Sequence, residues 1–193
     1  MTAGAPDAPT GPEIVPAPGA GTPDGIQRLW APQRMAYIGG EGKPTDGQAG
    51  AGCPFCRAPG QPDGDAFVLA RGTHVYALLN RYPYSPGHVL VCPYRHVADY
   101  LELTDAELDE LSRFVRDALT ALRGASGPDG FNLGMNLGVA AGAGIAAHLH
   151  AHVVPRWGGD ANFMPVIART KPLPELLIDS WRKVRATWPG VQG

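Results

Sequence analysis

The chain has 193 residues, of which 44% are hydrophobic, and it carries a formal net charge of −2. Length and composition suit one domain with a packed core, and the charge argues against a nucleic-acid partner. Three cysteines are too few for a disulfide framework. No apolar stretch approaches the ~20 residues of a membrane span, and no export signal opens the sequence, so we expect a cytoplasmic protein that does not associate with membranes.

The N-terminal quarter of the sequence is rich in proline and glycine. Residues 1–25 contain almost no large apolar side chains, which predicts a disordered tail. A domain is expected over residues 26–188, with an N-terminal extension at 26–52 and a core at 53–188. Residues 189–193 would form a short C-terminal tail.

Strands are predicted wherever a short segment has β-branched or aromatic content between turn residues. The turn at residues 81–87, for example, contains two prolines and a glycine. The predicted strands cover residues 67–70, 74–80, 88–93, 131–137 and about 147–154.

Two helices are predicted from capping signals and helical spacing of apolar residues. Thr104 and Glu107 form a capping box at the start of the first, and Gly124 marks its end. The second helix begins near Pro174 and has an apolar stripe of Leu177, Trp181, Val184 and Trp188. The sequence therefore predicts an α+β fold: an antiparallel meander sheet with one helix between strands and another at the C-terminus.

A run of three alternating histidines, His148, His150 and His152, lies in the fifth predicted strand. Alternate side chains of a strand share one face, so the three imidazoles would line up while the residues between them face the core. This pattern favours nucleophilic catalysis or metal binding over three surface histidines. Strand histidines two residues apart can also ligate a catalytic zinc, so a zinc-dependent hydrolase stays open as an alternative.

A glycine-rich loop over residues 138–144 precedes the histidine run. Glycines let backbone N–H groups approach an anion closely, so this loop beside the imidazoles predicts a phosphate pocket. Because the histidine pKa lies near 6.5, one ring can be a neutral nucleophile while another carries a proton. That division suits attack on phosphorus.

The histidine run resembles the signature of the histidine triad superfamily, because residues 148–154 fit the motif His-x-His-x-His followed by two apolar residues. Further segments resemble its fragile-histidine-triad branch and the bacterial diadenosine tetraphosphate phosphorylases: residues 28–35, 79–83 and 86–93, Asn136 with the glycine loop, and 155–163. Together the similar segments cover roughly residues 26–188. The resemblance implies the histidine triad fold and a homodimer or higher homo-oligomer.

The resemblance also implies a role for individual residues. His150 would attack the α-phosphorus and carry the nucleotidyl group as a phosphoramidate. His152 would hydrogen-bond the phosphoryl or leaving oxygen, and His148 would complete the triad. His88 would line the pocket, and Asn80 would contact the ribose hydroxyls. The polyphosphate would be held by Asn136 together with Gly142, Ala143 and Gly144. Trp157 would close the pocket, although a tryptophan at this position could instead belong to the core.

One segment departs from the family pattern. Many members carry glutamine and a hydroxyl residue just before the triad, where this chain has Ala143, Gly144 and Ile145. The loss of these donors would leave room for an acceptor phosphate, which favours phosphorolysis, and leaves open how the leaving group is protonated.

Cys53 and Cys56 form a Cys-x-x-Cys motif in a predicted loop. Zinc is one interpretation, and a redox pair or two free thiols is the alternative, although redox pairs usually open a helix after a strand. The resemblance supplies two further zinc ligands, His96 and His148, which implies a closed, structural Cys2His2 site.

Three functional hypotheses follow. The first is cleavage of dinucleoside polyphosphates through His150, either by inorganic phosphate to give ATP and ADP from diadenosine tetraphosphate, or by water with release of AMP. Nucleoside phosphoramidates are a further substrate class, and Mg2+ could accompany the polyphosphate. The second is a zinc-dependent hydrolase with metal on His150, and the third is a non-catalytic nucleotide-binding or partner-binding module.

Overall fold

The computed structural model describes residues 49–160 and 175–191. The predicted tail at 1–25, nearly all of the extension at 26–52 and the expected helix start at Pro174 lie outside these ranges. Within them, no helix is long and apolar enough to cross a membrane.

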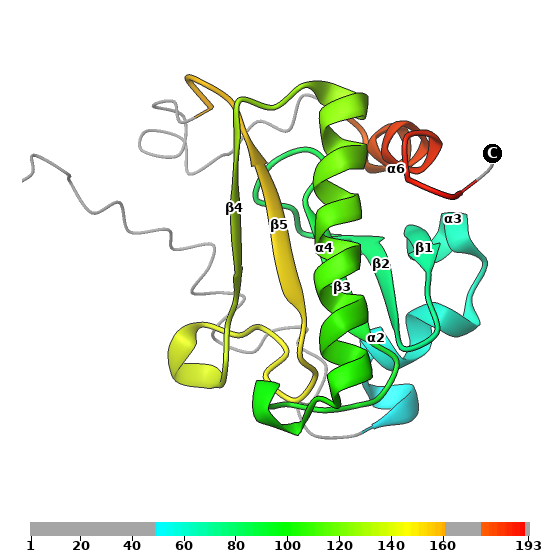
Figure 1. The fold of residues 1–193 in the computed structure, drawn as a ribbon, viewed down its shortest axis with the longest axis vertical. Coiled ribbons are helices and arrows are strands. Elements are labelled where there is room, and N and C mark those ends of the chain that lie inside the picture. Colours follow the sequence, from blue (N-terminus) through cyan, green and yellow to red (C-terminus); the bar gives the residue numbers. More distant parts are fainter. Residues whose placement is uncertain (1–48, 161–174, 192–193) are drawn as a thin grey trace, which may run out of the picture. The chain divides into compact units, whose positions relative to one another are not determined.

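The described residues form a single sheet flanked by helices (Figure 1). All pairings in this five-stranded sheet are antiparallel, in the order β1-β2-β3-β5-β4, which confirms the α+β prediction. The strands are β1 (Val68–Arg71), β2 (Val75–Leu79), β3 (Val89–Pro93), β4 (Gly130–Met135) and β5 (Ala151–Arg156). The helices are α2 (Pro54–Arg57), α3 (Asp63–Ala66), α4 (Asp105–Ser126) and α6 (Leu177–Ala186), with 3-10 turns η1 (Gly50–Gly52), η2 (Ala58–Gly60), η3 (Tyr100–Glu102) and η4 (Val139–Ala141).

The sheet order is sequential from β1 to β3 and then reverses, because β5 lies between β3 and β4. The long helix α4 carries the chain from β3 to the far edge, where β4 begins. The chain then returns through the glycine-rich loop to β5 in the interior. This order places His152 on an inner strand, opposite Leu90 of β3 and Gly134 of β4.

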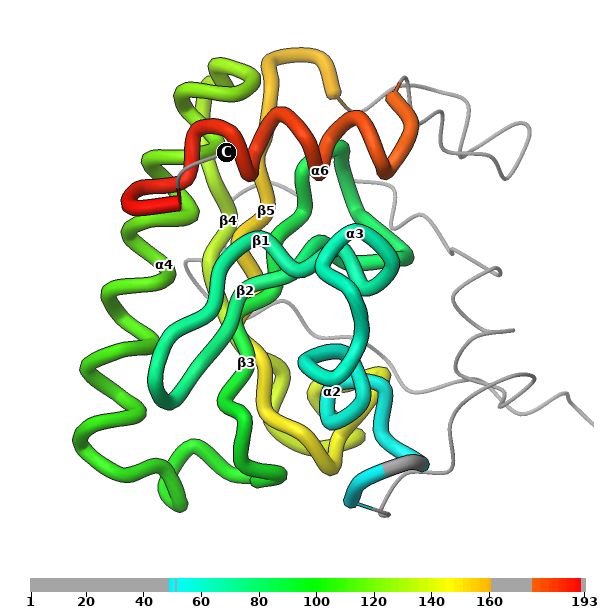
Figure 2. The backbone as a smooth tube through the Cα atoms, turned by 90° about the vertical axis from the view of Figure 1, so that its right-hand side faces the viewer, coloured from blue at the N-terminus to red at the C-terminus, as the bar shows by residue number. Residues whose placement is uncertain are grey.

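The two faces of the sheet are covered by different parts of the chain. Helices α4 and α6 pack on one face, where Leu122 and Val184 meet Val91 and Val153. The segment with α2 and α3 covers the other face, where Phe55 joins a buried cluster with strand residues. In Figure 2, α4 and α2 accordingly lie on opposite sides of the strands.

Several predicted boundaries of helices and strands were wrong by a few residues. Helix α4 does not end at Gly124 but continues to Ser126, and Gly127 caps it with a positive φ of 53°. Gly124 lies inside the helix, where a Cβ would be 3.2 Å from Cγ2 of Thr187, so the Thr187 side chain would have to shift slightly to accommodate it. The fifth strand begins at Ala151, so His148 and His150 precede it rather than belonging to it.

The prediction that Cys53 and Cys56 lie in a loop was also wrong. Cys53 is the N-cap of the one-turn helix α2, and Pro54 occupies its first turn, where proline is tolerated. A single turn is too short to show helical periodicity in the sequence. Since η1 rather than a strand precedes it, the motif still differs from the usual redox arrangement.

Candidate functional site

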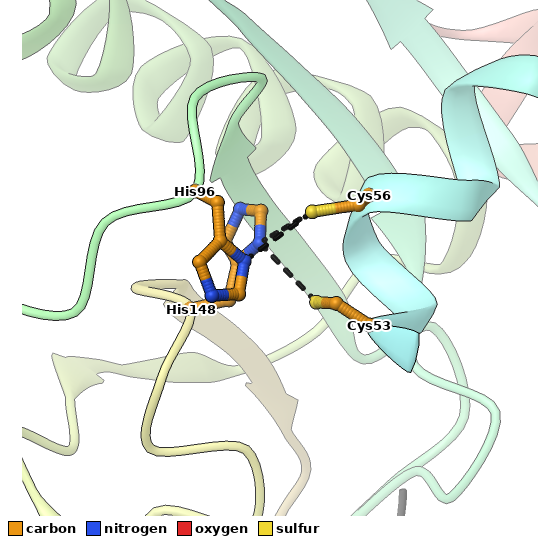
Figure 3. A group of neighbouring side chains, drawn as sticks. All are labelled: Cys53, Cys56, His96 and His148. Atoms are coloured by element: carbon orange, nitrogen blue, oxygen red, sulfur yellow. Dashed lines mark hydrogen bonds between the residues drawn. The ribbon is translucent and has the colours of Figure 1, made fainter. Parts of the chain in front are cut away.

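Four potential metal ligands meet between α2 and the sheet. Cys53 and Cys56 project from α2 toward His96, which follows β3, and His148, which precedes β5 (Figure 3). One donor atom from each of the four residues lies within 4.8 Å of all the others. Cys53 Sγ is 3.4 Å and Cys56 Sγ 3.6 Å from Nδ1 of His148, and Cys56 Sγ is 3.3 Å from Nδ1 of His96.

These separations fit a tetrahedral metal ion. Zinc with Zn–S near 2.3 Å and Zn–N near 2.05 Å would place sulfur and nitrogen ligands about 3.6 Å apart. His148 is also oriented for coordination, because its Nε2 lies 2.9 Å from the carbonyl oxygen of Pro93. A carbonyl can only accept, so Nε2 carries the proton and Nδ1 presents its lone pair to the thiols. Backbone carbonyls commonly orient metal-binding histidines in this way.

His150 is fixed by the residue at the start of the same histidine run. Its Nδ1 lies 2.9 Å from the carbonyl oxygen of His148 and therefore donates a hydrogen bond to it. In a neutral imidazole this leaves the lone pair on Nε2, the atom a nucleophile needs. Burial lowers the pKa of His150, outweighing the opposite effect of that hydrogen bond, so the neutral ring is favoured.

The ring of Phe55 lies between the cluster of four potential ligands and His150. Phe55 lies between the two cysteines in sequence and is 93% buried. Its ring centroid is 5.5 Å from that of His148 and 4.9 Å from that of His150. The α2 turn that carries the thiols therefore also holds a wall of the His150 site.

His152 faces the same side of the sheet and pairs with His88. The two ring centroids of His150 and His152 are 4.8 Å apart. Nδ1 of His152 is 2.9 Å from Nε2 of His88, a fully buried residue just before β3. Asn80, which follows β2, lies against His88 with its Nδ2 3.4 Å from Nδ1 of that ring.

A cleft of about 380 Å³ opens beside His152. Its lining comes from the turn before β3 and from strands β4 and β5: Tyr84, Ser85, Asn132, Leu133, Gly134, Met135, Asn136, His152, Val154 and Arg156. Two residues expected at the substrate, Asn136 and His152, thus lie together in it. Arg156 is bound by Asp160 and Asn132, so its charge is largely compensated.

Other expected site residues lie outside this lining, and they include His150, His88 and Asn80. Gly142 is exposed with a φ of 84°, Ala143 is buried and Gly144 is half-buried in the loop after η4. The Trp157 indole Nε1 donates to the carbonyl oxygen of Ser126, at the end of α4, at 3.4 Å. The roles expected for these residues stay predictions.

Two aromatic residues at the site were not expected from the sequence. Besides Phe55, Tyr84 stacks on His152 with a centroid distance of 5.9 Å and an interplanar angle of 15°. Its position in the proline-rich turn before His88 was a usable signal, because such turns place exposed side chains next to strand ends. For Phe55 the signal was its place inside the Cys-x-x-Cys motif.

Fold and site together define an α+β protein of the histidine triad class. A sequence model described as HIT domain matches residues 61–159. The AP-4-A phosphorylase of Mycobacterium tuberculosis (strain CDC 1551 / Oshkosh) is 46% identical over 172 residues, covering 88% of both chains. The chain belongs to the HIT domain family.

Solved structures agree with this assignment. A hypothetical histidine triad nucleotide-binding protein from Sulfolobus tokodaii strain7 superposes with a TM-score of 0.57 and 28% identity, over 70% of this chain and 91% of its own. A Zn-bound histidine triad family protein from Mycobacterium smegmatis has a TM-score of 0.56 and 25% identity, with the same coverage of 70% and 91%.

Proposed function

We propose that this protein cleaves diadenosine tetraphosphate through a covalent adenylyl-histidine on His150. The observation that carries the chemistry is the hydrogen bond from Nδ1 of His150 to the carbonyl of His148, which leaves the Nε2 lone pair available. The substrate is supported by the 46% identity to a phosphorylase named for it.

The reaction would proceed in two displacements at the same phosphorus. Nε2 of His150 attacks the α-phosphorus, the P–O bond to the β-phosphate breaks, and ATP leaves with the electron pair. Inorganic phosphate then attacks the phosphoramidate, the P–N bond breaks, and ADP leaves while His150 recovers its lone pair. His152 lines the cleft and would hydrogen-bond the phosphoryl or leaving oxygen. Asn136, in the same lining, would contact the polyphosphate, and Asn80 the ribose.

Product analysis tests this proposal. Diadenosine tetraphosphate with inorganic phosphate should give equal amounts of ATP and ADP, and AMP should replace ADP only if water is the acceptor. His150→Ala should lower turnover by at least about 10³-fold, as expected for loss of a nucleophile. Intact mass after a brief incubation should show one adenylyl group on the wild type and none on the variant. Absence of ADP in the presence of phosphate would rule out phosphorolysis.

We further propose that zinc is the metal of the Cys53, Cys56, His96 and His148 cluster and that its role is structural. Four protein ligands complete a tetrahedral shell, so no position remains for substrate. The bound ion would hold the thiolates and fix α2 against the sheet. His150 is not among the grouped donors, which favours a nucleophilic over a metal-ligating His150.

The remaining expectations concern assembly and surroundings. We propose a homodimer, for which β4 offers a surface: it is an edge strand of the sheet formed by the described residues, and its Leu133 is 53% exposed. Light scattering of the purified chain would measure its mass directly. We also propose a cytoplasmic location, which cell fractionation tests. Mg2+ would bind together with the polyphosphate, and turnover measured in the presence of a chelator tests this.

A further inference from the structure

We propose that His88 is a positioning residue that fixes the tautomer of His152, so that neutral His152 carries its proton on Nε2. The tautomer itself follows from hydrogen-bond partners alone. Its catalytic consequence rests on the function proposed above, and the two parts are tested separately.

Two hydrogen-bond donors approach Nδ1 of His88. The backbone N–H of Tyr84 donates to it at 3.1 Å, and the Nδ2 group of Asn80 lies 3.4 Å away. The amide orientation of Asn80 is fixed independently, because its Oδ1 accepts from the backbone N–H of Tyr82 at 2.9 Å. A backbone N–H cannot accept, so Nδ1 of His88 must present a lone pair.

The proton of neutral His88 therefore resides on Nε2, which lies 2.9 Å from Nδ1 of His152. A hydrogen bond at this distance needs one donor and one acceptor. Since His88 supplies the donor, Nδ1 of His152 is the acceptor. The proton of neutral His152 is consequently on Nε2. The opposite tautomer would bring two N–H groups face to face.

The surrounding packing prevents His88 from turning to a different arrangement. The ring is fully buried, and the residue's backbone is bonded on both sides, from Asn80 N–H to His88 O at 2.8 Å and from His88 N–H to Ser85 O at 3.1 Å. Ser85 in turn donates from Oγ to the carbonyl oxygen of Pro155 in β5 at 2.7 Å. The turn carrying His88 is thus tied to the strand carrying His152.

The two neighbouring imidazoles then have opposite polarity. His150 donates from Nδ1 and keeps a lone pair on Nε2, whereas His152 accepts at Nδ1 and holds a proton on Nε2. In the proposed reaction the first is a nucleophile and the second a hydrogen-bond donor to a phosphoryl or leaving oxygen. His152 donates a hydrogen bond and retains its proton, so no additional acid is needed for this role.

Nuclear magnetic resonance can observe the tautomer without any substrate. In the full chain labelled with 15N-histidine, long-range 1H–15N correlations at neutral pH distinguish protonated from unprotonated ring nitrogens. His88 and His152 are assigned from the signals lost in His88→Gln and His152→Asn. We expect protons on Nε2 and none on Nδ1 in both rings of the wild type. A proton on Nδ1 of either ring would overturn the proposal.

Two substitutions of His88 test the consequence for catalysis. Glutamine can accept from Tyr84 with Oε1 and donate to His152 with Nε2, whereas leucine can do neither. His88→Leu should lower kcat about 10- to 100-fold, as for other residues that orient a catalytic group, with KM changed less than about threefold. His88→Gln should recover most of that loss. Equal losses in both variants, or none in either, would contradict the positioning role.

These measurements separate the inference from the proposed function. If wild-type protein does not turn over diadenosine tetraphosphate, the proposed function fails, while the wild-type tautomers still decide the assignment of His88. If His88→Leu does not fold, as judged by circular dichroism, the wild-type spectrum alone remains decisive.

Discussion

At the scale of single residues, backbone carbonyls determine which nitrogen of two histidines is available. His148 donates from Nε2 to Pro93 and His150 donates from Nδ1 to His148. Two histidines that are two positions apart therefore present different atoms: Nδ1 of His148 faces the thiols, and Nε2 of His150 keeps the lone pair that the proposed reaction requires. Burial lowers the pKa of His148 to about 4, which keeps its ring neutral and able to bind a metal.

The proposed zinc site at Cys53, Cys56, His96 and His148 can be tested with a matched pair of cysteine substitutions. We expect about one zinc ion per chain in the wild type and its loss in Cys56→Ala, because three remaining ligands hold zinc less well than four. Cys92→Ala is the control, since Cys92 is buried outside the cluster.

Elemental analysis and thermal unfolding measure the two effects. Added zinc should raise the Tm of the wild type and of Cys92→Ala but not that of Cys56→Ala, because a ligand that binds only the folded state stabilises it. Equal zinc content in all three proteins would contradict the assignment.

At the scale of secondary-structure elements, two glutamates of α4 hold neighbouring segments in place. Glu107 completes the capping box with Thr104 and also binds Arg95, one residue before His96, at 2.7 Å. Glu110 is buried and accepts from the backbone N–H groups of Thr73, His74 and Val75 in the β1–β2 turn. Helix α4 therefore positions both the hairpin and the segment that carries His96, one of the four clustered potential ligands.

The Glu107 interactions predict a pH-dependent contribution to stability. Hydrogen bonds from Arg95 lower the pKa of Glu107 to about 2, overcoming the effect of burial. Because the pKa of Glu107 is lower in the folded than in the unfolded chain, its carboxylate stabilises the folded state at pH values above the unfolded-state pKa of about 4.5. This contribution is lost as the pH falls toward the folded-state pKa of about 2. Glu107→Gln should lower the free energy of unfolding at pH 7 by about 1–2 kcal/mol, the range of partly exposed charge-assisted hydrogen bonds.

Urea unfolding at a series of pH values checks this expectation. The difference between wild type and Glu107→Gln should be constant from pH 5 to 7 and shrink below pH 4.5. A difference independent of pH down to 2.5 would show that the carboxylate charge is not involved. The exposed Asp109, with the analogous change Asp109→Asn, is a control on the same helix.

At the scale of the whole molecule, the sheet separates two functions. One face is a continuous apolar core under α4 and α6, while the other carries the histidines, the cysteines and the cleft. Edge strand β1 is also covered, because Trp181 and Arg185 of α6 donate to the carbonyl oxygen of Val68. A substitution in the core under α4 and α6 is therefore expected to lower stability without removing any residue of the histidine and cysteine cluster.

A core substitution tests this separation. Leu122 of α4 is fully buried on the helix-covered face, and Leu122→Ala should lower the free energy of unfolding by about 2–5 kcal/mol. Leu101→Ala, at a position 89% exposed, should change it by less than about 0.5 kcal/mol. Zinc content of folded Leu122→Ala should equal that of the wild type. Loss of zinc at temperatures below unfolding would show that the two faces are coupled.

The sequence by itself determined the fold class, the five strands and the histidine face. Periodicity is a local property, so alternating residues such as Leu149, Ala151 and Val153 predict the buried side without knowledge of their partners. They do lie in the core with α4. The capping box of α4 was equally visible, because all its interactions fall within four residues.

Only the tertiary structure decided how distant residues contact one another. The resemblance already grouped His148 with Cys53, but the hydrogen bond between His88 and His152, which are 64 positions apart, is visible only in the folded chain. The pairing of β5 with β3 brings these two histidines together. No local signal encodes it, because strand order follows from how the long helix crosses the sheet. The tautomers of the histidines depend on those contacts, so they too became visible only in the folded chain.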